Sequence, residues 1–341
     1  MKGLYLLFIS VYFFSCGANK VVESKVSKPK NGLKIGFASC LHQNKPMPIF
    51  ETIKAENLDL FLLMGDNVYG NSVSEDLKEL RLAYEIQKQN FKKLDLNIPI
   101  EAIWDDNDYG LGDGGKEYRL KEKSKDLFLD FWNILKDDPR RKRSGLYHEI
   151  IKEYKGKSIQ ILILDTRTFR DNLKPTDVKG AVGKERYIPS LDSSLTMLGD
   201  EQWQWLSQKM YTNTDYRFII SSIQFLAIGH GWECWNNFPY ERERLIDLID
   251  RSNVKHTVLL SGDRHRGGHY ELKTKNNKII SEMTSSSLNV PYSNSEEPGP
   301  LRIGSTYSKE NYGVIKLVES QDSISVMLKN IRGEVVTSFK L

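Results

Sequence analysis

Short apolar runs alternate with helical segments along this chain, and this alternation restricts its fold more than any other feature. Six mainly apolar runs are each closed by a polar or acidic residue: Leu33–Ser39, Leu58–Met64, Ile98–Trp104, Ile159–Leu164, Phe218–Ile223 and Thr257–Leu260. Such runs are typical of strands that are buried on both faces. Four stretches between them have helical patterning: Ser74–Lys92, Lys116–Leu135, Asp200–Met210 and Glu241–Arg251. Strands that alternate with helices predict an α/β fold.

The last sixty residues have a different pattern. After about Ile279 the chain contains short alternating runs with no helix between them: Val314–Val318, Ser323–Leu328 and Val335–Lys340. Alternation of this kind indicates antiparallel strands, which we expect to complete a second sheet. Because no repeat or Pro/Gly-rich linker divides the chain after the N-terminal region, residues 32–341 are predicted to form one continuous domain.

The first residues have the pattern of an export signal. Lys2 precedes an apolar run from Leu4 to Phe14, which is shorter than the roughly 20 residues of a spanning helix. We therefore expect residues 1–15 to be a cleaved signal peptide. Cys16 follows this run as the cysteine does in a bacterial lipobox, which predicts a lipidated N-terminus with a tether over residues 16–31. The expected product is an exported cell-envelope lipoprotein, held on a membrane through Cys16; the alternative is a plain secretory signal.

The charge balance and the cysteines exclude two classes of protein. Lys and Arg number 49 and Asp and Glu 45, which gives a net charge of +4, too small an imbalance to indicate a nucleic-acid binder. Three cysteines cannot form a disulfide framework. Outside the cytoplasm Cys40 and Cys234 either form a disulfide, or Cys40 stays reduced as a metal ligand and Cys234 is a bystander.

Polar and ionisable side chains follow all six predicted strands. They lie in the segments FASC (37–40), GDNVYG (65–70), WDDNDYG (104–110), DTR (165–167), SIQ (222–224) and SGDRH (261–265). Functional groups gather at the carboxyl ends of strands in α/β sheets, so we expect these side chains to converge. Converging carboxylates repel one another and raise their pKa values unless a cation neutralises them. The sequence therefore predicts a metal site.

The donor types in these segments indicate two unlike metal ions. Carboxylate and amide oxygens favour hard cations such as Ca²⁺ or Mg²⁺, whereas a thiolate with a phenolate and a carboxylate favours a redox-active ion such as Fe³⁺. The set suggests two metals that share one Asp.

Seven motifs of this chain, in order, resemble the PhoD-like alkaline phosphatase D family over nearly all of residues 33–341. They are FASC (37–40), GDNVYG (65–70), WDDNDYG (104–110), LDTRTFR (164–170), LGDEQWQWL (198–206), WNNFPYERERLIDLI (235–249) and SGDRH (261–265). The resemblance implies a metallophosphoesterase-like four-layer αββα sandwich, in which helices flank two mixed central sheets. It also implies an exported hydrolase of phosphomonoesters, phosphodiesters or both, with Fe³⁺ and Ca²⁺ as cofactors, other divalent metals being the alternative.

The resemblance also implies roles for individual residues. Cys40 and Tyr69 would be iron ligands, and Asp66 would bridge the two metals. Asp105 would face the calcium side, and Asp263 and His265 would complete the site from the last strand. Arg167 would grip phosphate oxygens, a role that suits a bidentate guanidinium.

Two positions depart from the family pattern. Asn107 stands where the family usually has a His, and Gly112 stands where an Asn resembles a calcium ligand. Asn107 or Asp113 can supply a replacement oxygen, so Asn107 is kept as a candidate catalytic residue. The departures leave two alternatives to a simple phosphatase: a catalytically silent binding lipoprotein, or a hydrolase of another ester such as a sulfate or a phospholipid.

A loop ahead of the last helix adds further candidates. Within HGWECWNNFP (230–239), His230 and Glu233 are expected to lie beside the metal ligands. Trp232 is expected either to pack or to line the rim of a pocket.

Overall fold

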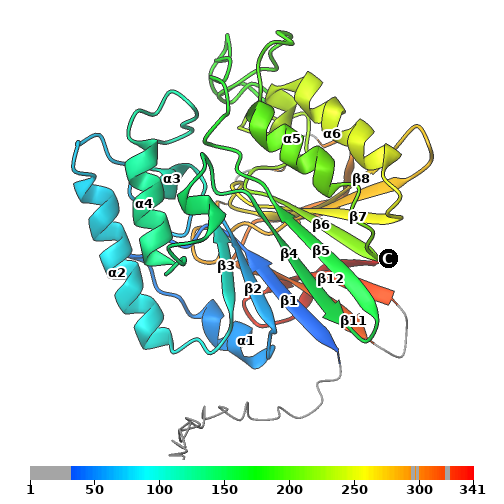
Figure 1. The fold of residues 1–341 in the computed structure, drawn as a ribbon, viewed down its shortest axis with the longest axis horizontal. Helices are drawn as coiled ribbons and strands as arrows, with labels where there is room; N and C mark the ends of the chain where they lie inside the picture. The colour runs from blue at the N-terminus through cyan, green and yellow to red at the C-terminus, as the bar shows by residue number, and fades with distance from the viewer. Residues whose placement is uncertain (1–31, 293–295, 297–298, 319–322) are drawn as a thin grey trace, which may run out of the picture. The chain divides into compact units, whose positions relative to one another are not determined.

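Two mixed β-sheets form the centre of the fold (Figure 1). The computed structural model describes residues 32–341 except 293–295, 297–298 and 319–322. The predicted signal peptide, the lipidation site at Cys16 and the tether lie outside the described residues and stay predictions. Within the described part of the chain, no helix has the length and apolar character that crossing a bilayer requires.

The first sheet has six strands in the order β13-β12-β11-β1-β2-β3. Three of them are parallel: β1 (Leu33–Ala38), β2 (Leu60–Met64) and β3 (Ile100–Ile103). The other three continue the sheet in antiparallel order: β11 (Asn311–Val318), β12 (Ser323–Asn330) and β13 (Val335–Lys340). We expected the last three strands to complete a second sheet, and this prediction was wrong. Alternation marks a strand but not its partner, and β11 pairs with the edge of β1 that β2 leaves open.

The second sheet has seven strands in the order β10-β8-β9-β7-β6-β5-β4. Its strands are β4 (His148–Tyr154), β5 (Lys157–Ile163), β6 (Tyr216–Ser221), β7 (His256–Ser261), β8 (Gly267–Lys273), β9 (Ile279–Thr284) and β10 (Arg302–Tyr307). Strands β5, β6, β7 and β9 are parallel neighbours. The sequence predicted β5, β6 and β7 but missed the other four, because β4, β8, β9 and β10 each contain charged residues and lack a continuous apolar run.

In the described part of the chain, six helices connect the strands of the two sheets. They are α1 (Ile49–Ala55), α2 (Lys78–Leu94), α3 (Asp106–Tyr109), α4 (Lys121–Phe131), α5 (Gly199–Lys209) and α6 (Pro239–Arg251). Two 3₁₀ turns, η1 (Pro139–Arg141) and η2 (Trp235–Asn237), precede β4 and α6. The four predicted helices are present with shifted bounds. Helices α1 and α3 were missed because each is too short to show a helical period.

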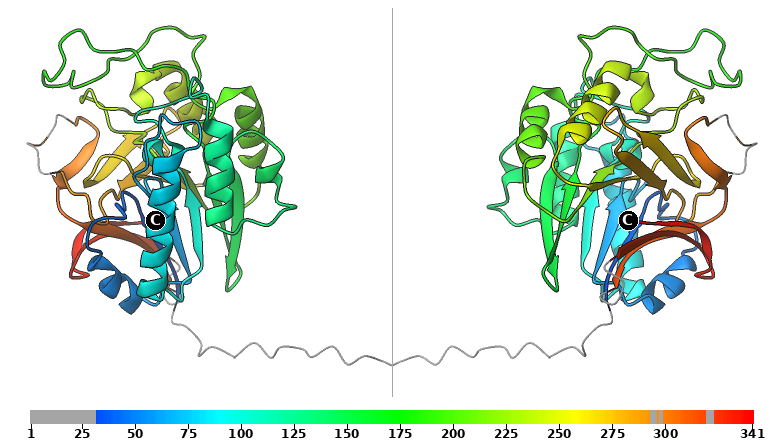
Figure 2. Two further views of the ribbon diagram at one scale, coloured as in Figure 1. Left: turned by 90° about the vertical axis from the view of Figure 1, so that its left-hand side faces the viewer. Right: turned by 90° about the vertical axis from the view of Figure 1, so that its right-hand side faces the viewer.

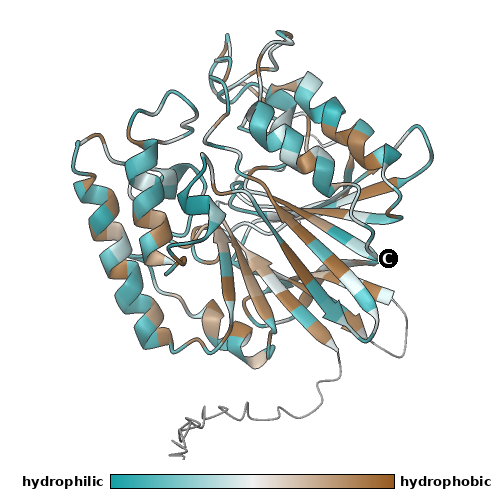
Figure 3. Cartoon of the chain, viewed as in Figure 1, coloured by the Kyte–Doolittle hydropathy of each residue, from teal (hydrophilic) through white to brown (hydrophobic). Residues whose placement is uncertain are grey.

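Alternate side chains of the second sheet face different layers. Ile161 of β5 and Phe218 of β6 pack between the sheets, in the same cluster as Phe37 of β1. Leu162 of β5 points to the other side and packs in a cluster with Trp203 of α5, and the same cluster includes Leu245 of α6. Helices thus cover the outer face of the second sheet, and α2 and α4 lie against the first (Figures 1 and 2). The central strands carry mainly hydrophobic residues, whereas hydrophobic and hydrophilic residues alternate along the helices (Figure 3). The predicted four-layer α/β sandwich is confirmed.

Close packing between β1 and β11 requires a glycine. Gly313 lies opposite Phe37 in the antiparallel ladder, and a Cβ atom at position 313 would overlap the fully buried Phe37 ring.

We expect Gly313→Ala to lower the free energy of unfolding by about 1–3 kcal/mol, the usual cost of overpacking. Urea denaturation measures this change. The control is Ser338→Ala, an exposed position on β13 of the same sheet, which should change stability by less than about 0.5 kcal/mol. Equal stability of the two variants would contradict the packing argument.

Candidate metal centre and active site

Four of the six predicted metal ligands have left-handed backbone conformations. The φ angles are 59° at Cys40, 53° at Asp66, 66° at Asp263 and 55° at His265. Residues other than glycine rarely adopt such angles, and they persist where the surrounding fold imposes them, often at functional sites. Each of these turns follows the end of a strand: β1, β2 or β7. Strained backbone therefore occurs at four of the six positions that were predicted from the sequence to be metal ligands.

One group of potential ligands joins a thiol, a carboxyl group and an imidazole. The ligand atoms of Cys40, Asp66 and His265 all lie within 4.8 Å of one another. The Cys40 Sγ is 3.5 Å from Asp66 Oδ2, and the Tyr69 hydroxyl is 3.5 Å from His265 Nε2. His265 Nδ1 bonds to the Val290 carbonyl, which only accepts, so Nδ1 carries the proton and Nε2 keeps a lone pair toward the site.

A second group consists of carboxylates. Ligand oxygens of Asp66, Asp105 and Asp106 lie within 4.8 Å of one another. Asp66 belongs to both groups, as a bridging ligand must. Asp106 was not among the predicted ligands; the acidic run 105–108 was the available signal, but the sequence did not show which carboxylates would converge. Asp108 in the same run serves the backbone instead, since its Oδ1 accepts a hydrogen bond of 2.6 Å from the Asp105 amide at the start of α3.

The charges in this region call for a cation. Burial and the neighbouring carboxylates, Asp106 first, raise the pKa of Asp66 well above its usual value. Burial raises the pKa of Asp105 to about 8, although the Arg167 guanidinium opposes the shift. The Asp105 Oδ2 atom is buried, and among the described residues no hydrogen-bond donor contacts it. An orphaned carboxylate oxygen beside two further carboxylates fits a hard metal ion, and the thiol, phenol and imidazole fit a softer one.

Arg167 lies behind the wall of the site and is fully buried. Its Nε donates a hydrogen bond of 2.6 Å to Asp105 Oδ1, and its Nη1 lies 2.9 and 2.8 Å from the two carboxylate oxygens of Glu233. Ser222 also donates to Asp105 Oδ1, and Arg170 forms an ion pair of 3.0 Å with Glu233. The sequence analysis gave Arg167 the role of gripping phosphate. In this arrangement Arg167 holds Asp105 in place, and Glu233 lies beside the site as expected.

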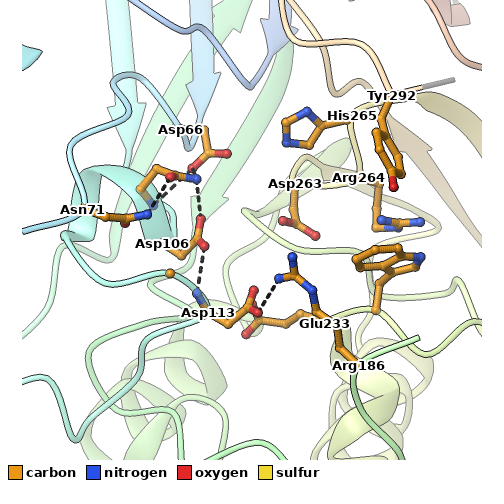
Figure 4. A pocket seen from close by; sticks show the side chains of 13 residues that line it. Asp66, Asn71, Asp106, Asp113, Arg186, Glu233, Asp263, Arg264, His265 and Tyr292 are labelled. Atoms are coloured by element: carbon orange, nitrogen blue, oxygen red, sulfur yellow. Dashed lines mark hydrogen bonds and ion pairs between the residues drawn. The ribbon is translucent and has the colours of Figure 1, made fainter. Parts of the chain in front are cut away.

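A cavity of about 380 Å³ opens over the two groups of ligands. Asp66 and Asp106 lie on one wall, and Asp263 and His265 on the other (Figure 4). The guanidinium groups that line this cavity belong to Arg186 and Arg264. Among the predicted site residues Asp66, Asn107, Asp263 and His265 line it. Cys40 and Asp105 are fully buried, and neither they nor Tyr69 belongs to its lining.

The two residues that depart from the family pattern, Asn107 and Gly112, both line this cavity. The Asn107 Nδ2 atom donates to Asp66 Oδ1 at 3.1 Å and to Asp106 Oδ1 at 2.9 Å. A Cβ at Gly112 would lie 3.6 Å from Asn71 Nδ2 and 3.9 Å from Asp106 Oδ2. The amide of Asn71, which sequence reasoning missed, thus approaches the space that a side chain at position 112 would enter, and it donates to Asn107 Oδ1 at 3.2 Å.

Asp113, the other predicted replacement for a lost ligand, is directed elsewhere. Its Oδ2 accepts hydrogen bonds from Arg186 Nη1 at 2.6 Å and from the Tyr187 hydroxyl at 2.7 Å. Its backbone amide donates to Asp106 Oδ2 at 2.8 Å. Asp113 therefore connects the second ligand group to the segment around Arg186.

Cys40 and Cys234 are both buried free thiols, so the disulfide alternative is wrong. Cys40 Sγ lies 3.1 Å from the Ser286 hydroxyl beside the ligands, whereas Cys234 starts the turn η2. Cys40 is available as a ligand in this state, and Cys234 is a bystander.

The two mixed sheets, and the carboxylates gathered where their strands end, define a metallophosphoesterase-like α/β protein. Within that class, the chain belongs to the PhoD-like phosphatase family, whose pattern it matches over residues 35–340. This confirms the family resemblance that the seven motifs indicated.

Individual proteins agree with this assignment. The chain is 23% identical over 292 residues to alkaline phosphatase D of Bacillus subtilis (strain 168), which covers 73% of this chain and 49% of that protein. It therefore spans about half the length of this curated relative. A solved structure of PhoD superposes with a TM-score of 0.68 at 18% identity, over 92% of this chain and 68% of that one. Purple acid phosphatase PPD1 from yellow lupin (Lupinus luteus) superposes with a TM-score of 0.61 at 11% identity, over 91% and 53%. The two structures show a shared fold.

Removing the Arg167 guanidinium should destabilise the whole domain. Arg167→Gln leaves the buried carboxylate of Asp105 without a charged partner and leaves Glu233 with Arg170 alone, and loss of one partner of a buried ion pair costs about 3–5 kcal/mol. Urea denaturation of the chelator-treated protein measures the difference. Arg119→Gln, which removes an exposed ion pair with Glu75, is the control and should cost less than about 1 kcal/mol. A similar, small loss in both variants would show that Arg167 is not a structural anchor.

The stability of the metal-free protein should fall as the pH rises. Burial raises the pKa of Asp108 to about 7 and that of Asp105 to about 8, whereas both are about 3.9 in an unfolded chain. Between these limits the folded state binds more protons at these two carboxyl groups than the unfolded state does, so they make the free energy of unfolding decrease with pH. Five histidines whose pKa values are lowered by burial act in the opposite direction near and below pH 6.5. Urea denaturation at pH 7, 7.5 and 8 in the presence of a chelator therefore measures the slope. Added metal should flatten it, and a stability that rises with pH under chelation would contradict the charge analysis.

Proposed function

We propose that this chain is an exported, metal-dependent phosphoesterase that hydrolyses phosphomonoesters, phosphodiesters or both. The observation that carries the proposal is the pair of ligand groups that share Asp66 at the floor of one cavity. Membership of the PhoD-like phosphatase family supports it. A protein that only binds a partner has no evident need for this concentration of buried carboxylates, because each one costs folding energy when no cation is present.

The donor sets suit two different metal ions. Cys40, Tyr69, Asp66 and His265 would hold Fe³⁺, since a thiolate, a phenolate and an imidazole favour such an ion. Asp66, Asp105 and Asp106 would hold Ca²⁺ or another hard divalent cation. When bound, the two ions would activate a water molecule and neutralise charge on the phosphoryl group. Asp263 lies on the cavity wall opposite Asp66 and would complete the site.

The other residues of the site would bind the substrate and hold the metal ligands in position. Arg186 and Arg264 line the cavity and can bind phosphoryl oxygens, a role suited to guanidinium groups. Arg167 keeps Asp105 oriented, and Asn107 keeps Asp66 and Asp106 together through its amide. In the overall reaction a water oxygen forms a bond to phosphorus, the phosphorus–oxygen bond to the alcohol breaks, and the alcohol oxygen takes a proton.

The location of the activity is part of the same proposal. A signal peptide over residues 1–15 and lipidation of Cys16 would export the enzyme and hold it on a membrane of the cell envelope. The expected substrate is then a phosphate ester outside the cytoplasm.

Loss of the shared carboxylate should abolish hydrolysis. Asp66→Asn is expected to lower kcat/KM for p-nitrophenyl phosphate and for bis-p-nitrophenyl phosphate by more than about 100-fold, because even residues that only support metal ligands contribute 10–100-fold. The assay uses purified protein supplied with Fe³⁺ and Ca²⁺, and metal content is measured in parallel and should fall in the variant. Asp137→Asn, at an exposed position, is the matched control and should be as active as the wild type.

Two outcomes would count against this function. A folded, metal-loaded wild type that hydrolyses neither ester would favour the alternatives raised by Asn107 and Gly112: a silent binding lipoprotein or a hydrolase of another ester. Unchanged activity in Asp66→Asn would mean that the two ligand groups are not the catalytic site.

A further inference from the structure

A second cavity of about 760 Å³ adjoins the one that holds the ligand groups. The two cavities share four lining residues, Asp113, Arg186, Trp232 and Tyr292. We refer to the first as the inner cavity and to the second as the outer cavity. A leaving group that is too large for the space beside a phosphoryl group in the inner cavity must extend past the shared residues.

One irregular hairpin, residues 174–188, builds the far wall of the outer cavity. Its two arms are joined by hydrogen bonds from the Thr176 amide to the Arg186 carbonyl and from the Ile188 amide to the Lys174 carbonyl. The amides of Arg186 and Tyr187 both donate to the Gly231 carbonyl, at 2.9 and 2.8 Å. The wall is therefore held by backbone bonds.

Gly231 allows this hairpin to lie close to the Trp232 loop. A Cβ atom at position 231 would overlap the backbone of Lys184 and Glu185. The Glu185 carboxylate also accepts a hydrogen bond from the Gly231 amide. These contacts hold the hairpin against the loop that carries Trp232, and both Tyr187 and Trp232 line the outer cavity.

Asp113 fixes the distance between the hairpin and the metal ligands. Its side chain binds Arg186 and Tyr187, and its backbone amide binds Asp106. The outer cavity is thus tied through one residue to the ligand group that would hold the phosphoryl group. Both the ion pair and the phenol hydrogen bond lie at the passage between the two cavities.

The lining of the outer cavity is aromatic, and its charges balance, since Lys179 and Arg186 offset Asp113 and Glu185. Three rings contribute to it: Tyr187, Trp232 and Tyr292. The Trp232 and Tyr292 rings meet edge to face, with centroids 6.2 Å apart and an angle of 84°. The Arg186 and Arg264 guanidinium carbons lie 5.1 and 5.2 Å from the centre of the Trp232 ring. The passage between the two cavities is therefore lined by flat groups: aromatic rings, which carry π electrons, and guanidinium groups, which are positively charged.

We propose that the outer cavity binds the leaving group of the substrate and selects a planar aromatic one. The inference rests on the proposed phosphoesterase function, because it needs a phosphoryl group in the inner cavity. A ring attached to the ester oxygen finds three aromatic side chains and a guanidinium in the lining of the outer cavity. An aliphatic polyol has no ring to stack there, and the carboxylates that could accept its hydroxyl groups, those of Asp113 and Glu185, are already engaged. Trp232, at the junction of the cavities, is the specificity-determining residue.

The test compares three monoesters of primary alcohols, so that the bond that breaks is the same. They are glycerol 1-phosphate, benzyl phosphate and adenosine 5′-monophosphate. In the wild type we expect a lower KM for the two aromatic esters. Trp232→Ala should raise their KM about tenfold, in line with the loss of one stacking contact, and raise the KM of glycerol 1-phosphate clearly less, because for that ester only the contacts of the Trp232 ring with Arg186 and Arg264 are lost. The two aromatic esters separate a ring that binds by itself from a nucleoside that binds as a whole.

Two further variants make the result interpretable. Trp232→Phe keeps a ring and should retain most of the preference, which a merely structural role for Trp232 would not predict. Tyr211→Ala removes an aromatic ring that is 85% exposed outside both cavities and should leave every KM unchanged. An equal rise in KM for all three esters in Trp232→Ala, or no preference in the wild type, would overturn the proposal.

A binding measurement separates this proposal from the proposed function. Calorimetric titration with adenosine and with glycerol, in the presence of inorganic phosphate, needs no turnover. Adenosine binding that is lost in Trp232→Ala supports the subsite even if no ester is hydrolysed, in which case only the proposed function fails. Hydrolysis of the esters together with no difference between adenosine and glycerol would retain the enzyme and reject the aromatic subsite.

Discussion

The convergence of carboxylates at the meeting point of two sheets is the constraint on which the rest of this structure depends. Asp66 and Asp105 come from the first sheet and Asp263 from the second, and burial raises the pKa of each. Buried like charges are tolerated only when something compensates them. The buried Arg167 neutralises part of this negative charge through its ion pairs with Asp105 and Glu233. Cations bound on the cavity side would neutralise the rest. The guanidinium and the metal ions would thus balance one acidic cluster from two directions.

The same constraint explains the strained turns. A strand that continued as ordinary extended backbone would point its next side chains alternately to the two faces of the sheet. The left-handed conformations at Cys40, Asp66 and His265 come soon after strand ends, and the ligand atoms of these three residues lie within 4.8 Å of one another. Asp263 has the same left-handed backbone conformation. Since each such residue costs of order 1 kcal/mol or more, the packed layers on both sides must supply that energy. The site is therefore held by the core of the αββα sandwich, and the hairpin 174–188 is an addition at its edge.

Much of this arrangement was readable from the sequence. Continuous apolar runs identified six parallel strands, β1 to β3 and β5 to β7, because strands buried on both faces have few polar interruptions. The parallel strand β9 was missed because Ser281 and Glu282 interrupt its apolar residues. The chemistry of the site was readable because its residues follow the predicted strands directly, and parallel strands place their next residues at one edge of the sheet. The antiparallel edge strands β4 and β10 were missed because neither contains a continuous apolar run. Asp106 was missed because one acidic run contains ligands and a helix cap side by side.

The sequence by itself determined the family, the α/β class and the set of residues that meet at the strand ends, because these depend on local order along the chain. Only the tertiary structure decided which sheet receives β11, since pairing depends on which strand edge remains open. It also decided that Arg167 is buried while Arg186 and Arg264 face the cavity, because the exposure of a long side chain depends on segments distant in sequence. The outer cavity is likewise a tertiary feature: its walls come from residues near positions 113, 180, 232 and 292, which no sequence period connects.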